Sequence, residues 1–184
     1  MKRASRRTIF LLLVLAAACG ALQPAGSGAA GERPHPRWQR LAPNGFSAIR
    51  PPQLYGTAER PLVDGTIFNY MDGGGVAYLE HGFVELFHAE YAGKDGLAIS
   101  LDVFTMGTAE QAQAALVDER ICPAGGAPLG FVPAGKAFRF PPDYFIYYSV
   151  GNKLIYLHVN DDRHRGGLDR FAVQLRSLVG KEEP

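Results

Sequence analysis

The chain of 184 residues has little of several things, and each shortage excludes a class of protein. It holds 2 cysteines, too few for a small domain built on a disulfide framework. Its formal net charge is +1, which argues against nucleic acid as a partner, because nucleic-acid binding favours a strongly basic face. Mean hydropathy is -0.06 and only one long apolar run exists, which excludes a polytopic membrane protein.

The remaining composition is that of one ordinary globular domain, with 47% hydrophobic and 20% charged residues. That apolar content is enough to form a core, so disorder throughout the chain is excluded. Two catalytic signatures are missing: no serine sits in a nucleophile elbow, and no His-Glu-x-x-His zinc motif occurs. The sequence therefore predicts no catalytic residue and no cofactor.

Residues 1–18 have the three parts of an export signal, namely a basic start, an apolar stretch and small residues at a cleavage site. The adjacent Arg6 and Arg7 resemble a twin-arginine signal, and the alternative is a general export signal with an ordinary basic start. The residues up to Cys19 resemble a lipobox, in which the cysteine is acylated and becomes the new N-terminus. The alternative is plain cleavage after Ala18.

The signal predicts an exported protein, located in the periplasm or on the outer surface. Acylation of Cys19 would hold it at the membrane. Removal of residues 1–18 takes four of the 19 basic residues and none of the 18 acidic ones, so the mature chain is slightly acidic. Residues 19–37 are rich in alanine, glycine and proline, which is typical of a flexible tether. We expect one globular domain over residues 38–180.

Alternating apolar and polar residues predict two antiparallel hairpins, one over residues 83–104 and one over residues 144–159. Helical spacing of apolar residues predicts three helices. These begin near Thr66, Ala109 and Leu168. The pattern indicates an α+β domain, in which one antiparallel sheet of four to six strands is covered by about three helices.

Three consecutive glycines, Gly73, Gly74 and Gly75, interrupt the first predicted helix. Each costs about 1 kcal/mol relative to alanine within a helix, so we expect a break or a bend there. We expect the glycines to allow close packing, so that Gly74→Ala lowers stability by more than about 1 kcal/mol. The alternative is a binding role, in which Asp72 and the glycines expose backbone N–H groups to an anion or a sugar.

Two motifs carry a resemblance to a known family. Residues 65–74 read Gly-Thr-Ile-Phe-Asn-Tyr-Met-Asp-Gly-Gly, and residues 78–83 read Tyr-Leu-Glu-His-Gly-Phe. Together with Met-Gly-Thr at 106–108, they resemble a bacterial family of exported proteins of unknown function, over residues 63–179. Gly75 departs from that pattern, which has alanine there. The resemblance implies an exported or lipid-anchored location and carries over no activity and no catalytic residue.

Aromatic residues are concentrated in the second predicted hairpin and just before it. An exposed row of such rings could stack on sugars or on a peptide, although aromatic residues are also ordinary strand formers. The residues in this region are Phe138, Phe140, Tyr144, Tyr147, Tyr148 and Tyr156. We single out Tyr147 and Tyr156 as binding candidates.

His158, Asp161, Asp162 and His164 are of the types that hold zinc or a similar ion. The same residues also suit a solvated turn before a helix, where carboxylates are favourable without any metal. We expect these residues to form a solvated turn and to hold no structural metal. A looser group contains Glu80, His81 and His88, of which we expect His88 to be packed or hydrogen-bonded.

The sequence thus predicts an exported, non-enzymatic domain that binds an unidentified protein or small ligand. The alternative is a small extracytoplasmic hydrolase or metal-dependent enzyme that uses His158 and the neighbouring aspartates.

Overall fold

The structure is a computed structural model, and it describes residues 42–181. The predicted export signal with Arg6 and Arg7, the candidate lipid attachment site Cys19 and the predicted tether over residues 19–37 all lie outside the described residues. They stay predictions from the sequence.

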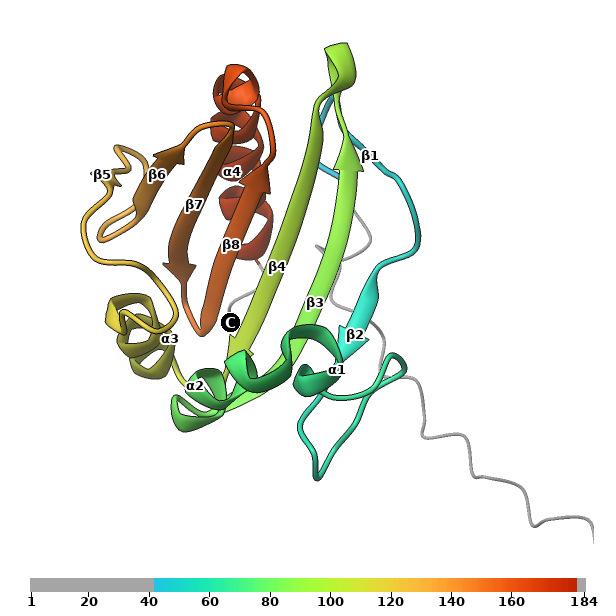
Figure 1. Ribbon diagram of the computed structural model, residues 1–184, viewed down its shortest axis with the longest axis vertical. Coiled ribbons are helices and arrows are strands. Elements are labelled where there is room, and N and C mark those ends of the chain that lie inside the picture. The colour runs from blue at the N-terminus through green and yellow to red at the C-terminus, as the bar shows by residue number, and fades with distance from the viewer. Residues whose placement is uncertain (1–41, 182–184) are drawn as a thin grey trace, which may run out of the picture. The chain divides into compact units, whose positions relative to one another are not determined.

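The described residues form an antiparallel sheet that packs against four helices (Figure 1). The strands are β1 (Ser47–Ala48), β2 (Gln53–Tyr55), β3 (Phe83–Ala92), β4 (Ala98–Met106), β5 (Ala127–Pro128), β6 (Lys136–Phe140), β7 (Asp143–Val150) and β8 (Lys153–Val159). The helices are α1 (Ile67–Met71), α2 (Gly75–Glu80), α3 (Ala109–Val117) and α4 (Arg165–Val179), with short 3-10 turns η2 (Asp72–Gly74), η3 (Lys94–Gly96) and η4 (Asp162–His164). Within residues 42–181, no helix is long and apolar enough to cross a membrane.

The sheet joins the two predicted hairpins side by side. Its strand order is β1-β3-β4-β8-β7-β6-β5, with β2 also paired to β3, and every pairing is antiparallel. The α+β class and both hairpins are confirmed. The sheet has eight strands rather than four to six, because β1, β2 and β5 are pieces of two or three residues that are too short to show alternation.

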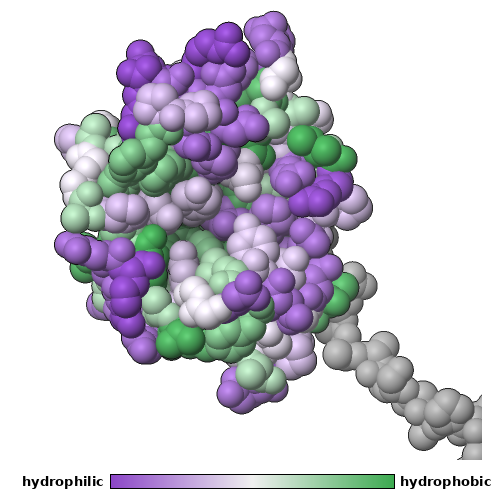
Figure 2. Space-filling view, in the orientation of Figure 1, coloured by the Kyte–Doolittle hydropathy of each residue, from purple (hydrophilic) through white to green (hydrophobic). Residues whose placement is uncertain are grey.

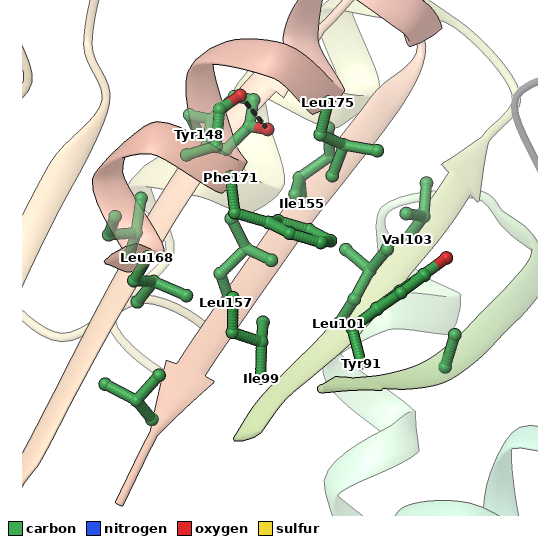
Figure 3. Packing of buried hydrophobic residues seen from close by; sticks show 14 of the residues in the cluster. Tyr91, Ile99, Leu101, Val103, Tyr148, Ile155, Leu157, Leu168, Phe171 and Leu175 are labelled. Atoms are coloured by element: carbon green, nitrogen blue, oxygen red, sulfur yellow. Dashed lines mark hydrogen bonds between the residues drawn. The ribbon is translucent and has the colours of Figure 1, made fainter. Parts of the chain in front are cut away.

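Helix α4 packs on one face of the sheet, behind β7 and β8 (Figure 1). Phe171 of α4 is fully buried and points toward the strands (Figure 3). Its ring lies edge-on to that of Phe46, at 4.9 Å between centroids. The Tyr148 hydroxyl donates to the backbone oxygen of Ala172 at 3.2 Å. Tyr144 lies at this face too, since its hydroxyl donates to Asp169 on α4 at 3.0 Å. Tyr144 and Tyr148 therefore do not belong to an exposed aromatic row, which corrects that part of the prediction.

The opposite face is covered only in part, by α1, α2 and α3, which lie toward one end of the sheet (Figure 1). Tyr78 of α2 stacks on Phe104 of β4 with ring centroids 4.1 Å apart. Leu116 of α3 and Leu154 of β8 are buried in the same apolar cluster. We call the rest of this face the open face. Over the middle of β6, β7 and β8 most of its side chains are half-buried, and beside them it includes the buried Asp102 of β4 and His88 of β3.

The predicted break in the first helix is confirmed. Helix α1 ends at Met71, Asp72 adopts a φ of 46° and α2 begins at Gly75. The reason given for the glycines was wrong at Gly74: a Cβ there would lie 3.9 Å from the Met71 side chain, which is ordinary contact. A Cβ on Gly75 would instead lie 3.0 Å from Cγ2 of Ile67. The close approach thus belongs to Gly75, where α2 packs on α1.

We expect Gly75→Ala to lower the free energy of unfolding by about 1 kcal/mol, because overpacking a buried contact outweighs the gain in helix propensity. Ile67, which must move, is fully buried. Gly74→Ala is the matched control, expected to be neutral or slightly stabilising since its methyl group has room. Urea denaturation of both variants measures the difference. Equal stability of the two variants would contradict the packing argument.

Candidate functional site

A row of polar and aromatic side chains crosses the sheet on the open face. His88 of β3 stands opposite Asp102 of β4, Asp102 opposite Tyr156 of β8, and Tyr156 opposite Tyr147 of β7. Side chains at directly opposed positions of paired strands point to the same side of the sheet. The row therefore brings together residues from two hairpins that are distant from each other in the sequence.

Asp102 is the centre of a buried hydrogen-bond network. The Tyr70 hydroxyl, from α1, donates to its two carboxylate oxygens at 2.8 and 2.9 Å. Nδ1 of His88 lies 2.7 Å from Oδ1 of Asp102. His88 and Asp102 are only 6% and 4% exposed. Because an ionised carboxylate only accepts hydrogen bonds, Nδ1 of His88 carries a proton that it donates to Asp102.

Four tyrosines, from two helices and two strands, lie close enough to Asp102 for its negative charge to raise their pKa values. Burial raises the pKa of Tyr156 to about 12, and the negative charge of Asp102 adds to the effect. Burial is also the main reason why the pKa values of Tyr70, Tyr78 and Tyr147 lie well above their usual range, and the charge of Asp102 contributes at each. All four phenols are therefore neutral donors at neutral pH.

The hydroxyls of Tyr147 and Tyr156 are available to a ligand. Neither has a hydrogen-bond partner among the residues that the structure describes, and neither is an enclosed, unsatisfied atom. Their rings lie 4.7 Å apart between centroids and are half-buried. The two residues named as binding candidates from the sequence thus do lie together on the open face.

Phenylalanine rings from β6 and β7 lie next to this row. Phe145, which the sequence did not single out, stacks on Phe138 at 5.2 Å and on Phe140 at 5.7 Å between centroids. Phe140 is 60% exposed. Figure 2 looks onto this face and shows apolar side chains gathered over β6 and β7, with a hollow beside α3. The open face therefore offers flat apolar rings next to hydroxyl and imidazole groups.

The candidate metal ligands are not brought together. Nε2 of His158 pairs with Asp143 at 2.7 Å. Asp161 and Asp162 instead face arginines: the guanidinium of Arg163 lowers the pKa of Asp161 to about 2, and Asp162 pairs with Arg139. His164 lies 4.0 Å from Asp161. Across residues 42–181, no group of three or more metal-binding side chains forms.

The remaining candidates lie apart from this row. His81 pairs with Asp118 at 2.9 Å and Glu80 with Arg120 at 2.7 Å, so neither belongs with His88. In the glycine segment, Asp72, Gly73 and Gly74 are exposed and Gly75 is buried. A binding role for that segment stays a prediction.

Sequence reasoning missed Asp102 and Tyr70, the two residues that organise the site. A signal for Asp102 was present, since it is a carboxylate in the middle of a strand whose neighbours are apolar. Such a residue must find partners when its strand becomes central in the sheet. No comparable signal marks Tyr70, because its spacing in the helix is also that of an ordinary core residue.

Comparisons with known proteins add little to this geometry. None of the protein-family models matches the chain, and no curated protein sequence matches it. Among solved structures, the extracellular domain of PknH from Mycobacterium tuberculosis is similar in part, with a TM-score of 0.41 and 11% sequence identity over 75% of this chain and 86% of that chain. A structural similarity this low indicates nothing about the function of the chain.

Proposed function

We propose that this protein is an exported binding domain that holds a saccharide on the open face of its sheet, without transforming it. The observation that carries the proposal is the pair of unpartnered hydroxyls on Tyr147 and Tyr156, which lie beside the buried Asp102 network. Ligand sites of this kind combine flat apolar surface with a few fixed polar groups.

A sugar ring matches both parts of this surface. It has an apolar face of C–H groups, which packs on aromatic rings, and a polar edge of hydroxyls, which needs donors and acceptors. Phe145, Tyr147 and Tyr156 provide the rings. The hydroxyls of Tyr147 and Tyr156 can both donate and accept hydrogen bonds. Asp102 positions Tyr70 and His88 rather than the ligand, because both of its oxygens are already engaged.

The location of the domain rests on the sequence. The export signal over residues 1–18 supports transport across the membrane, and the lipobox-like residues before Cys19 support a lipid anchor. The family resemblance supports the same placement. A tether of Ala, Gly and Pro residues would then allow the domain to reach ligands some distance from the membrane.

Isothermal titration of the purified protein with chitotetraose and cellotetraose tests the proposal. We expect measurable binding of at least one of the two. We expect Tyr156→Phe, which keeps the ring and removes the hydroxyl, to weaken binding about fivefold, the worth of one ordinary hydrogen bond. Tyr144→Phe is the matched control, because Tyr144 lies on the α4 face, and it should leave affinity unchanged.

Two results would contradict the proposal. One is no binding of either oligosaccharide at millimolar concentration, and the other is equal weakening by the Tyr156 and Tyr144 variants. Cleavage of a bound oligosaccharide, followed by chromatography, would replace the binding role by the alternative of a hydrolase.

A further inference from the structure

A second concave feature lies away from the open face, at the start of α4. It is a cavity of about 430 Å³, within the usual size range of small-ligand sites. Three separate segments line it: the loop before β1 around Asn44, the β3–β4 turn with Lys94 and Asp95, and the first turns of η4 and α4 up to Gln174. The aromatic row plays no part in it.

The charge of the lining is mostly positive. Lys94, Arg163 and Arg170 line the cavity, against Asp95 as the one carboxylate among its lining residues. Arg163 is held by Asp161, at 2.6 Å. In contrast, the side chains of Lys94 and Arg170 have no hydrogen-bond or ion-pair partner among residues 42–181. Two cations from different segments therefore line one cavity without forming an ion pair, and Asp95 is the one opposite charge in its lining.

The fold fixes the geometry of this cavity while leaving it open. A Cβ on Gly167 would lie 2.5 Å from Cδ2 of the buried Leu97, so α4 packs tightly against the beginning of β4. A Cβ on the neighbouring Gly166 would meet nothing closer than Arg170, at 4.0 Å. The backbone N–H of Arg165 already donates within η4, to Asp162. The side chains rather than the helix end therefore supply the positive charge.

From this arrangement we propose a binding site for a small phosphate-bearing anion, held between Lys94 and Arg170. The planar guanidinium of Arg170 suits two oxygens of one phosphate, and the ammonium of Lys94 adds a compact charge from the β3–β4 turn. His164 and Gln174 line the cavity beside them and can donate to further oxygens. The same chemistry fits a free phosphate compound and a phospholipid headgroup.

Titration with inorganic phosphate, followed through the backbone amide signals of Gly166 and Gly167 by NMR, tests this site directly. We expect saturable shifts that weaken as salt is added, because both attractive side chains are charged. Arg170→Gln and Lys94→Gln should each weaken phosphate binding at least fivefold. Arg176→Gln is the matched control, an exposed arginine on the same helix outside the cavity, and should change affinity less than twofold.

Sedimentation with lipid vesicles distinguishes a phospholipid headgroup from a free phosphate compound as the ligand. Stronger sedimentation of the protein with phosphatidylglycerol vesicles than with phosphatidylcholine vesicles, lost in Arg170→Gln, would assign the site to a headgroup. Phosphate shifts without vesicle binding would assign it to a free compound. Absence of both signals, or equal weakening by Arg170→Gln and Arg176→Gln, would overturn the proposal. Neither outcome depends on the saccharide titration, which reports on another face of the domain.

Discussion

We expect Asp102→Ala to lower the free energy of unfolding by about 3 kcal/mol. The substitution removes the shared acceptor of the Tyr70 hydroxyl and of Nδ1 of His88. These two groups, 3.0 Å apart, are then left with only each other as partners beside the buried imidazole. Loss of one partner from a buried, hydrogen-bonded pair costs about 3 to 5 kcal/mol, and an unpaired buried donor costs about 1 to 3 kcal/mol. Urea denaturation measures the effect.

Asp143→Ala is the control for Asp102→Ala. Asp143 forms a similar contact with His158 at 2.7 Å, but its side chain is 44% exposed, so water replaces the lost partner. Pairs at the surface are worth about 0 to 1 kcal/mol. Comparable losses in the two variants would show that the Asp102 network contributes no more than a surface pair. Asp102→Asn should recover part of the loss, because its amide oxygen can still accept from Tyr70.

Alkaline pH should unfold the domain cooperatively, starting above about pH 10, the ordinary pKa of tyrosine in an unfolded chain. Burial raises the pKa of Tyr144 and Tyr156 to about 12, and keeps those of Tyr78 and Tyr148 well above their usual range. A folded-state pKa above the unfolded value gives stability that is fully present below about pH 10. It is lost as pH rises through the folded value, because the unfolded chain releases its protons first.

Phenolate absorbance and circular dichroism, followed together between pH 8 and pH 12 in the range set by these pKa values, measure this transition. We expect both signals to change in one step. Tyr148→Phe removes one fully buried phenol and should reduce the fall in stability over that range. Stepwise titration of the tyrosines near pH 10, with the fold intact, would contradict the prediction.

The sequence predicted the architecture where the signal was local. Both hairpins carry long alternating runs, and the turn at Gly151 has the positive φ that a tight turn requires. The cap of α3 is also as expected, since the Thr108 hydroxyl accepts from the backbone of Gln111 at 3.2 Å. Short edge strands were missed, because a strand of two residues is defined by its partner and has no pattern of its own.

The site was harder to predict, because it depends on register between distant strands. The alternation placed Tyr147 and Tyr156 within one hairpin, so their closeness followed from local pairing. Asp102 joins them only because β4 pairs with β8, a contact that no nearby residues specify. The metal hypothesis failed for a related reason. Asp161 and Asp162 are close in sequence to His158, but arginines provide their partners.

The pairing of β4 with β8 has a consequence for how the domain assembles. Each hairpin can close by itself through a short turn, whereas β4 ends at Met106 and β8 begins at Lys153, so their union must close a long loop. Until that union, each hairpin presents the unpaired edge of a long strand, which is a template for pairing with other chains. We therefore expect the step that joins β4 to β8, and so completes the open face, to be the slow step of folding and the one that removes these exposed edges.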